Sequence, residues 1–211
     1  MKIVVTGAGG FLGWHLRCRL RALTDHEVVA VDRSSFGTLG KMMATADAVI
    51  HVAGVNRAET DAEVVDGNVQ LAEAVASAVR ASRSVRRIVY ANSIQAGNGS
   101  PYGTGKQDGA GLLEAVAEEC DAAFVDVLLP NIFGEHGRPS YNSFVATFCH
   151  EVVAGRTPTV NDNKVGLLHV QDAAQALIDA LDGPSRVEKP EAEEHGVVEV
   201  LQLLQEEQLH T

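Results

Sequence analysis

The sequence is poor in cysteine and in long apolar runs, and each shortage argues against a class of protein. Three cysteines stand far apart among 211 residues, at positions 18, 120 and 149, and no CxxC motif occurs. Neither a disulfide framework nor a thiolate zinc site is indicated, and we expect no bound metal. We interpret the three cysteines as small buried hydrophobic side chains in a reducing compartment.

Targeting and membrane segments are also lacking. The apolar stretch near the N-terminus is only Ile3 to Val5, which is too short for a signal peptide. No apolar run approaches the roughly 20 residues that a membrane-spanning helix needs. These features predict a soluble cytoplasmic protein.

Positive charge is scarce as well. Seventeen Lys and Arg face 28 Asp and Glu, which gives a net charge of −11, and seven of the glutamates lie in residues 187–211. An acidic surface repels phosphate backbones and anionic lipids. Nucleic acid and membranes are therefore poor candidates as partners.

Short β-branched runs alternate with longer helical stretches in the first 130 residues. Several runs are apolar on both faces, as a parallel sheet covered by helices requires. The predicted strands are Lys2–Thr6, Glu27–Asp32, Ala48–Val52, Arg87–Asn92 and Ala122–Leu128, and the predicted helices are Phe11–Leu23, Asp61–Ala81 and Tyr102–Cys120. This alternation predicts an α/β fold with a doubly wound parallel sheet of the Rossmann type.

The alternation fades after Pro130. We expect a helix over Ser140–Gly155, a short extended piece over Val165–His169 and a helix over Gln171–Leu181. The acidic stretch Glu188–Glu194 is typical of a solvated linker, and apolar residues from Val197 onward recur at helical spacing. We therefore divide the chain into a Rossmann domain over 1–183, with substrate-loop insertions at 131–165, and an acidic linker with a C-terminal helix over 184–211. The substrate-binding part at the C-terminal end is small and reduced.

A glycine-rich turn joins the first strand to the first helix, in the sequence TGAGGFLG. Such a turn lets the backbone approach a pyrophosphate, and the following helix directs its first N–H groups at the negative charge. The motif therefore predicts binding of a dinucleotide. The turn contributes the candidate cofactor residues Gly7, Gly9, Gly10, Phe11, Leu12 and Gly13.

The end of the second strand bears on the choice between NAD and NADP. Asp32 is placed where a carboxylate can accept both ribose hydroxyls of an adenosine, which favours NAD. Arg33 favours NADP instead, since its guanidinium could hold a 2′-phosphate, although it could equally be a solvated surface residue. NAD is slightly favoured on these residues.

Tyr102 and Lys106 are four residues apart and so lie on one face of a helix. Ser93 follows the fourth strand, at the edge where ligands of open α/β sheets bind. A Ser, a Tyr and a Lys beside a nicotinamide make a site for carbonyl reduction. Ser93 would orient the carbonyl, Tyr102 would donate the proton, and Lys106 would stabilise the phenolate and reach the nicotinamide ribose.

The set TGAGGFLG, Ser93 and YGTGK resembles the extended short-chain dehydrogenase/reductase superfamily over residues 1 to about 181. The segments TDHEV, HVAGVNR, NSIQAG, LPNIFG and RPSYNSFVATFCH resemble, more narrowly, the reductase half of a bacterial capsular polysaccharide enzyme family. That family reduces a 4-keto group on a UDP-linked N-acetylated deoxysugar and usually works with NADPH. One departure is Leu128, which stands where the family has an arginine.

The resemblance implies further site residues by position. Toward the cofactor it implies His51, Val52, Ala53, Gly54, Asn68, Pro130 and Asn131, and toward the sugar nucleotide Asn56, Arg57, Arg138, Tyr141 and Asn142. His169 and Asp172 resemble a structural pair near the end of such domains. Superfamily members often pair through the helices after the third and fourth strands, which implies a homodimer.

Three functions stay open at this point. We expect NAD(P)-dependent reduction of a 4-keto group on a nucleotide-linked, UDP-type deoxy-amino sugar. A sugar-nucleotide epimerase is the first alternative, and a catalytically weak NAD(P)-binding regulatory protein is the second. Dehydration is disfavoured, because Ile94 and Gln95 follow Ser93 where dehydratases carry an acidic residue.

Overall fold

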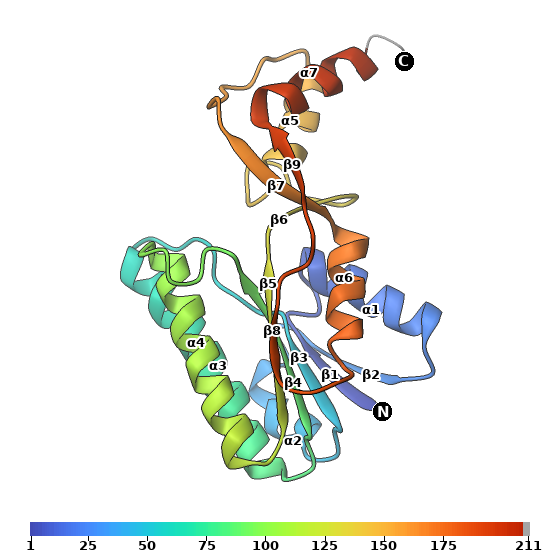
Figure 1. Cartoon of the computed structure of the whole chain (residues 1–211), viewed down its shortest axis with the longest axis vertical. Helices are drawn as coiled ribbons and strands as arrows, with labels where there is room; N and C mark the ends of the chain where they lie inside the picture. The colour runs from blue at the N-terminus through green and yellow to red at the C-terminus, as the bar shows by residue number, and fades with distance from the viewer. Residues whose placement is uncertain (209–211) are drawn as a thin grey trace.

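The computed structural model describes residues 1–208, which form a large parallel sheet between two layers of helices and a smaller group of elements above it (Figure 1). The strands are β1 Lys2–Thr6, β2 Glu27–Val31, β3 Ala48–His51, β4 Arg87–Ser93, β5 Ala123–Leu129, β6 Asn131–Phe133, β7 Lys164–His169, β8 Arg186–Glu188 and β9 Glu193–Gly196. The helices are α1 Phe11–Leu23, a short 3-10 turn η1 Phe36–Thr38, α2 Leu39–Met43, α3 Asp61–Ser82, α4 Pro101–Glu119, α5 Phe144–Val153, α6 Val170–Asp179 and α7 Val197–Gln208.

The large sheet has the strand order β2-β1-β3-β4-β5-β8, and every neighbouring pair is parallel. The chain leaves β1 toward β2 and then returns to β3 on the other side of β1, so the order of the strands reverses between β1 and β3. Ligands of such sheets bind at this reversal, outside the carboxyl ends of the strands. The predicted doubly wound fold is confirmed.

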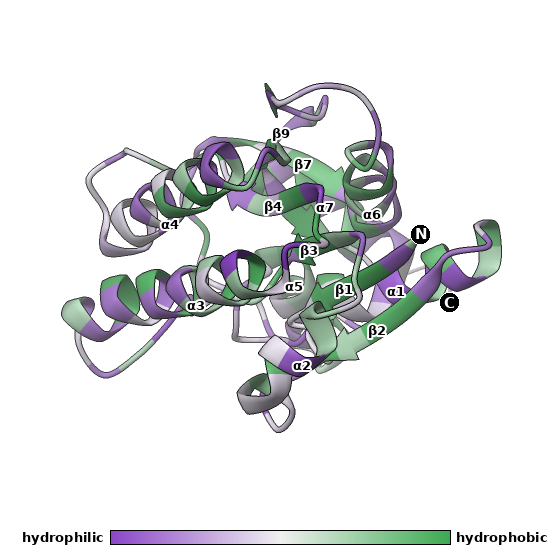
Figure 2. Cartoon of the chain, turned by 90° about the horizontal axis from the view of Figure 1, so that it is seen from below, coloured by the Kyte–Doolittle hydropathy of each residue, from purple (hydrophilic) through white to green (hydrophobic). Residues whose placement is uncertain are grey.

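Each face of the sheet has its own core. Helices α1 and α6 pack together over Ile3, Val5, Val89 and Val125 on one face, and α2, α3 and α4 cover Val4 and other side chains on the opposite face. Figure 2 shows the strands in hydrophobic colours between these two layers. Because both faces are covered, the strands are apolar on both sides, as the sequence pattern indicates.

A second sheet of three strands, β6-β7-β9, lies beyond the carboxyl end of the large sheet (Figure 1). Strand β6 follows β5 after a single residue, and β7 runs directly into α6. Helices α5 and α7 pack on each other through Phe148, Val152, Val197 and Leu201. This small lobe is therefore tied to the large sheet at β5 and α6, next to the region where ligands bind.

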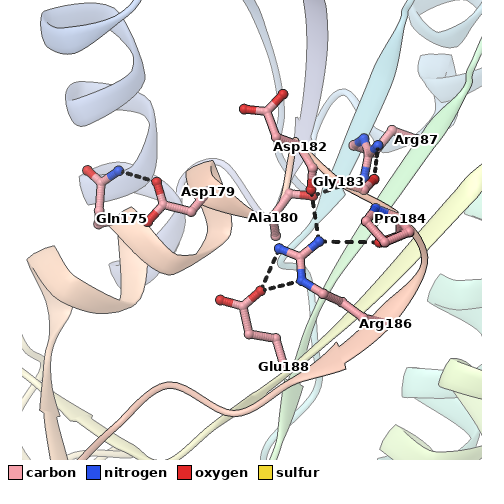
Figure 3. A network of polar contacts seen from close by, with 9 residues as sticks. All are labelled: Arg87, Gln175, Asp179, Ala180, Asp182, Gly183, Pro184, Arg186 and Glu188. Carbon is pink, nitrogen blue, oxygen red and sulfur yellow. Dashed lines mark hydrogen bonds and ion pairs between the residues drawn. The ribbon is translucent and has the colours of Figure 1, made fainter.

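The stretch predicted as a solvated acidic linker, Glu188–Glu194, joins two short strands that the sequence pattern did not indicate, and its glutamates at 191, 193 and 194 are exposed. Residues 186–188 form β8 as the edge strand beside β5, and residues 193–196 form β9, antiparallel to β7. Arg186 fixes β8: its guanidinium donates to the Asp182 carbonyl at 2.8 Å and pairs with Glu188 at 2.7 Å, while Arg87 donates to the Gly183 carbonyl at 2.6 Å (Figure 3). These contacts hold the acidic stretch against the fold.

Smaller differences concern helix ends and cysteines. Helix α5 begins at Phe144 instead of Ser140, because the Ser143 hydroxyl caps it by accepting from the Ala146 N–H. The predicted C-terminal helix is present as α7, and residues 209–211 of the predicted C-terminal part lie outside the described residues. The cysteines are not buried: Cys18 is exposed, and the other two are half-buried.

Candidate active site

The glycine turn lies at the reversal point of the sheet. Gly7 has a φ of +66°, a left-handed value that favours glycine, and a Cβ there would stand 2.6 Å from the Ala53 nitrogen. A Cβ on Gly13 would collide with the Gly7 carbonyl oxygen, which also accepts from the Gly10 N–H at 2.9 Å. The turn is therefore closed tightly by its glycines. No side chain caps the start of α1 and its first turn carries no acidic residue, so the backbone N–H groups can face an anion such as a pyrophosphate.

Asp32 lies just after β2, and its side chain is exposed. Its Oδ1 accepts four hydrogen bonds from the backbones and hydroxyls of Ser34 and Ser35, at 2.7 to 3.0 Å. These bonds lower the pKa of Asp32 to about 2. The carboxylate is therefore charged and oriented by its own turn, with Oδ2 directed to no partner within residues 1–208, and it fits a ribose diol. Arg33 beside it is exposed, so the choice between NAD and NADP stays open.

A second segment that the resemblance assigns to the cofactor, residues 51–54, is held from behind by polar side chains. The Thr6 hydroxyl accepts from the Val52 and Ala53 N–H groups. Asn68 donates to the carbonyls of Val55 and Val64 at 2.7 and 2.8 Å and accepts from the Val55 N–H. Both amide hydrogens of Asn68 are thus used on the backbone, and Asn68 supports the loop instead of pointing into the site. Its direct contact with a cofactor stays a prediction.

Ser93 ends β4, and α4 begins close to it. The Ser93 hydroxyl accepts from the Gln95 N–H at 3.2 Å, and the Ser100 hydroxyl caps α4 by accepting from the Gly103 N–H. A Cβ on Gly103 would collide with the Gln95 carbonyl oxygen. The glycine after Tyr102 therefore allows the first turn of α4 to press against the loop that follows Ser93.

Lys106 is buried, with 2% of its surface exposed. Its ammonium donates to the Ala91 carbonyl at 2.7 Å and lies 3.9 Å from the centre of the Tyr90 ring. Burial lowers the pKa of Lys106 to about 7, although the nearby Asp126 carboxylate opposes the change. Because it is buried, this ammonium can lose or gain its proton near neutral pH.

Tyr102 is a protonated phenol. Burial raises the pKa of Tyr102 to about 12, so the phenol keeps its proton. A lowered pKa of Tyr102 would need a close ammonium together with a cationic nicotinamide, and the Lys106 ammonium is engaged with the Ala91 carbonyl of β4. The protein's own residues therefore hold Tyr102 in the protonated form that a general acid requires.

The candidate substrate residues come from two loops that meet. Arg57, after β3, donates to the Ser140 carbonyl at 3.4 Å, and the Arg138 guanidinium lies 5.3 Å from the centre of the Tyr141 ring. Asn56 is half-buried, whereas Arg57, Arg138, Tyr141 and Asn142 are exposed. An exposed pair of arginines beside an aromatic ring suits a nucleotide diphosphate, because guanidinium groups bind phosphates in a bidentate manner.

Other candidates tie the small lobe to the sheet. Asn131 donates to the Gly166 carbonyl at 3.3 Å, next to the half-buried Pro130. His169 caps α6 and lies 3.5 Å from the Glu135 carboxylate, while Asp172 is in the first turn of α6. His169 thus contacts the start of α6 and Glu135, and its pairing with Asp172 stays a prediction.

Sequence reasoning did not single out three polar side chains beneath Lys106: Tyr90, Asn92 and Asp126. All three are buried, at 1%, 3% and 8% exposure. A buried carboxylate in the middle of the apolar run Ala123–Leu129 was the available signal.

Comparison with known proteins agrees with this geometry. Residues 3–196 match the NAD dependent epimerase/dehydratase family. The chain is 36% identical over 186 residues to a UDP-2-acetamido-2,6-beta-L-arabino-hexul-4-ose reductase from Pseudomonas aeruginosa, with 87% of this chain and 50% of that protein covered. The capsular polysaccharide assembling protein CapF from Staphylococcus aureus superposes with a TM-score of 0.86 at 32% identity, covering 100% of this chain and 60% of that one. A UDP-glucose 4-epimerase from Thermus thermophilus, solved with NAD, has the same fold, with a TM-score of 0.84 at 21% identity over 98% of this chain and 83% of that one.

A doubly wound parallel sheet with a glycine turn at its reversal point defines a dinucleotide-binding fold of the Rossmann type. The chain belongs to the NAD dependent epimerase/dehydratase family, and its cofactor is NAD or NADP. It spans about half the length of the reductase it matches. No helix within the described part of the chain is long and apolar enough to cross a membrane.

Proposed function

We propose that the protein reduces a 4-keto group on a UDP-linked deoxy-amino sugar, with NAD(P)H as the hydride donor. The observation that carries the proposal is the hydrogen bond from the buried Lys106 ammonium to the Ala91 carbonyl, two residues before Ser93, on a helix that also carries the protonated Tyr102. The 36% identity to a reductase of such a sugar nucleotide supports the choice of substrate.

The bound cofactor supplies a hydride to the carbonyl carbon, and the residues of this chain handle the carbonyl oxygen. Ser93 donates a hydrogen bond to that oxygen and orients it. Tyr102 then transfers its phenolic proton, which is favourable because an alkoxide is more basic than a phenolate with a pKa of about 12. We assign to Lys106 the stabilisation of the phenolate that remains, which requires its ammonium to turn from the Ala91 carbonyl toward Tyr102. Asp32 together with the glycine turn holds the dinucleotide.

Arg57, Arg138 and Tyr141 bind the nucleotide part of the substrate, with Asn56 and Asn142 at its side. Their loops meet through the bond from Arg57 to the Ser140 carbonyl. The small lobe is the substrate-binding part, because it is attached at β5 and α6 beside the site. Asn131 and Pro130 connect the lobe to the cofactor side.

The test is the oxidation of NADPH or NADH by the purified chain in the presence of a UDP-linked 4-keto deoxy-amino sugar. Tyr102→Phe keeps the ring and removes only the proton donor, so kcat should fall by at least about 100-fold while cofactor affinity stays within about twofold. Near-normal turnover by Tyr102→Phe would contradict the catalytic assignment. Interconversion of UDP-sugars without net cofactor consumption would indicate an epimerase, and tight cofactor binding without turnover would indicate a regulatory protein.

We further propose a homodimer formed through the outer sides of α3 and α4, which pack side by side on one face of the sheet (Figure 1). Two such pairs would form a four-helix interface. Sedimentation equilibrium checks this, and a monomer at all concentrations would contradict it. A cytoplasmic location suits cysteines that are free in the structure, because free thiols persist in a reducing compartment.

A further inference from the structure

Four polar side chains form a row across four neighbouring strands of the large sheet, from the last residue of β1 to the middle of β5. Thr6 on β1 is in register with His51 on β3, His51 with Tyr90 on β4, and Tyr90 with Asp126 on β5. Residues in register on parallel strands project to the same face, and Tyr90 places this row under α3 and α4, since it belongs to the core on that face. The four side chains are 0%, 1%, 1% and 8% exposed.

Hydrogen bonds fix the protonation state at the Thr6 end of the row. The Thr6 oxygen accepts from two backbone N–H groups, so its own hydrogen is left for His51 Nδ1, 2.6 Å away. His51 is therefore a neutral ring with its proton on Nε2, and burial lowers its pKa to about 3. Its ring stacks on Tyr90 with 5.3 Å between the ring centres. This end of the row carries no charge.

The charged groups, Asp126 and the Lys106 ammonium, lie at the other end of the row. Asp126 Oδ2 accepts from Asn92 at 3.1 Å, whereas Oδ1 is buried with no hydrogen-bond partner in residues 1–208. The Lys106 ammonium lies over the neighbouring Tyr90, and Lys106 and Asp126 each favour the charged form of the other. Asp126 is thus a buried carboxylate on the strand next to the Tyr90 ring that carries the buried ammonium.

The same carboxylate is connected to Ser93. Asn92 donates to Asp126 through its amide nitrogen and accepts from the Ser93 N–H through its amide oxygen at 2.8 Å. The bond to Asp126 orients the amide group so that its oxygen faces the Ser93 peptide. Asp126 therefore acts on Lys106 through its charge, and on Ser93 through the side chain of Asn92.

We propose that Asp126 is a positioning residue for the catalytic site, which keeps the Lys106 ammonium charged and, through Asn92, fixes the backbone of Ser93. The proposal rests on the proposed function, because it assigns Asp126 to that same site. It accounts for an otherwise costly arrangement: a buried carboxylate is retained where an apolar residue would fit the strand better.

The groups around Lys106 leave Asp126 as its buried opposite charge. His51 from β3 is neutral, Tyr90 from β4 and Tyr102 from α4 have raised pKa values and stay protonated, and α3 contributes Val65 and the uncharged Asn68 near Gly105. Glu114 of α4 is exposed and acts on Asp126, whose pKa is raised mainly by burial.

The first experiment follows the titration of Lys106 by NMR of protein labelled with 13C at lysine Cε, with the signal assigned by its loss in Lys106→Met. In Asp126→Asn, which keeps an acceptor for Asn92, the titration of Lys106 should move to lower pH by roughly one pH unit, as loss of a nearby opposite charge usually causes. Glu118→Gln removes an exposed charge from the same helix and should leave the titration unchanged. An unchanged titration of Lys106 in Asp126→Asn would overturn the proposal.

The second measurement is the pH profile of kcat, whose alkaline limb should move to lower pH in parallel, with cofactor affinity at pH 6 unchanged. A uniform loss of kcat at all pH values would indicate a merely structural role and would also overturn the proposal. Because the NMR titration needs no substrate, it tests Asp126 even if the protein reduces no keto sugar. If Asp126→Asn does not fold, Asn92→Ala provides the same test: it removes the donor that favours the charged carboxylate, so the titration of Lys106 should again move to lower pH, and an unchanged titration would contradict the proposal.

Discussion

The Thr6 hydroxyl lies 2.6 Å from His51 Nδ1 in the interior of the sheet, and burial, helped by the nearby Lys106 charge, lowers the pKa of His51 and keeps its imidazole ring neutral. An unfolded chain takes up a proton on this ring near pH 6.5, whereas the folded protein does so only near pH 3. Acid therefore favours the unfolded state between these two values, and the stability linked to His51 is complete only above pH 6.5.

The first prediction is that His51 makes the protein acid-sensitive. Between pH 7 and pH 5 the free energy of unfolding should fall by about 2 kcal/mol because of this one ring, since one pKa unit corresponds to about 1.36 kcal/mol. His51→Asn keeps an acceptor for Thr6 and should lose that much less over the same interval. Urea unfolding at the two pH values measures the difference. His150→Asn, an exposed histidine on α5, should behave like the unmodified protein.

The second prediction is that the buried Lys106 ammonium lowers the free energy of unfolding near neutral pH. Its pKa falls from 10.5 in the unfolded chain to about 7 in the folded protein, so stability should rise by about 2 kcal/mol from pH 7 to pH 9, where the unfolded chain binds more protons. Lys106→Met should lack this rise, because no group at position 106 then titrates over the interval. It should also lose activity and cofactor affinity. Lys41→Met, at an exposed position, is the control and should keep the rise, and a Lys106→Met variant whose stability still rises by about 2 kcal/mol from pH 7 to pH 9 would contradict this account of the buried ammonium.

The sequence predicted the elements of the large sheet because each has a period or an apolar run of its own. The strand β4 and the helix α3 are found within two residues of their predicted ends. The segments RVE and EEHG, which form β8 and β9, have no such pattern. They become strands because Arg186 and the neighbouring edge of β5 or β7 hold them, which are contacts between residues distant in sequence.

The residues of the candidate site likewise fall into two groups, those indicated by local sequence spacing and those placed by contacts between distant segments. Ser93, Tyr102, Lys106 and the glycine turn follow from local spacing, so they could be predicted. The position of Asp126 beside Lys106 depends on the register between β4 and β5, which pairs Tyr90 with Asp126. The turn of Ser34 and Ser35 around Asp32 likewise appears only when the backbone is folded.

The third prediction concerns the choice of cofactor. Asp32→Asn keeps an oxygen for the Ser34 and Ser35 N–H groups but removes the charge, so the local turn should survive. Affinity for NAD should fall about tenfold or more, since hydrogen bonds to a charged group contribute about 1.5–3 kcal/mol. Affinity for NADP should fall less or rise. Fluorescence titration with both dinucleotides measures this, with the exposed Asp25→Asn as control. A greater loss for NADP than for NAD would show that Asp32 does not bind the ribose as assigned.

The fourth prediction concerns Arg138, which lies in an exposed loop against the Tyr141 ring. Arg138→Ala should raise the KM for the UDP-sugar by about 10- to 100-fold, because a charge-assisted contact with the diphosphate is lost. Arg138→Lys keeps the charge but not the bidentate geometry, so its KM should lie between the two. Cofactor affinity should stay unchanged in both variants, as it should in Arg21→Ala, an exposed arginine at the end of α1. Steady-state kinetics together with a direct cofactor titration separates the two ligands. A variant with normal KM and weak cofactor binding would assign this loop to the dinucleotide instead of the sugar nucleotide.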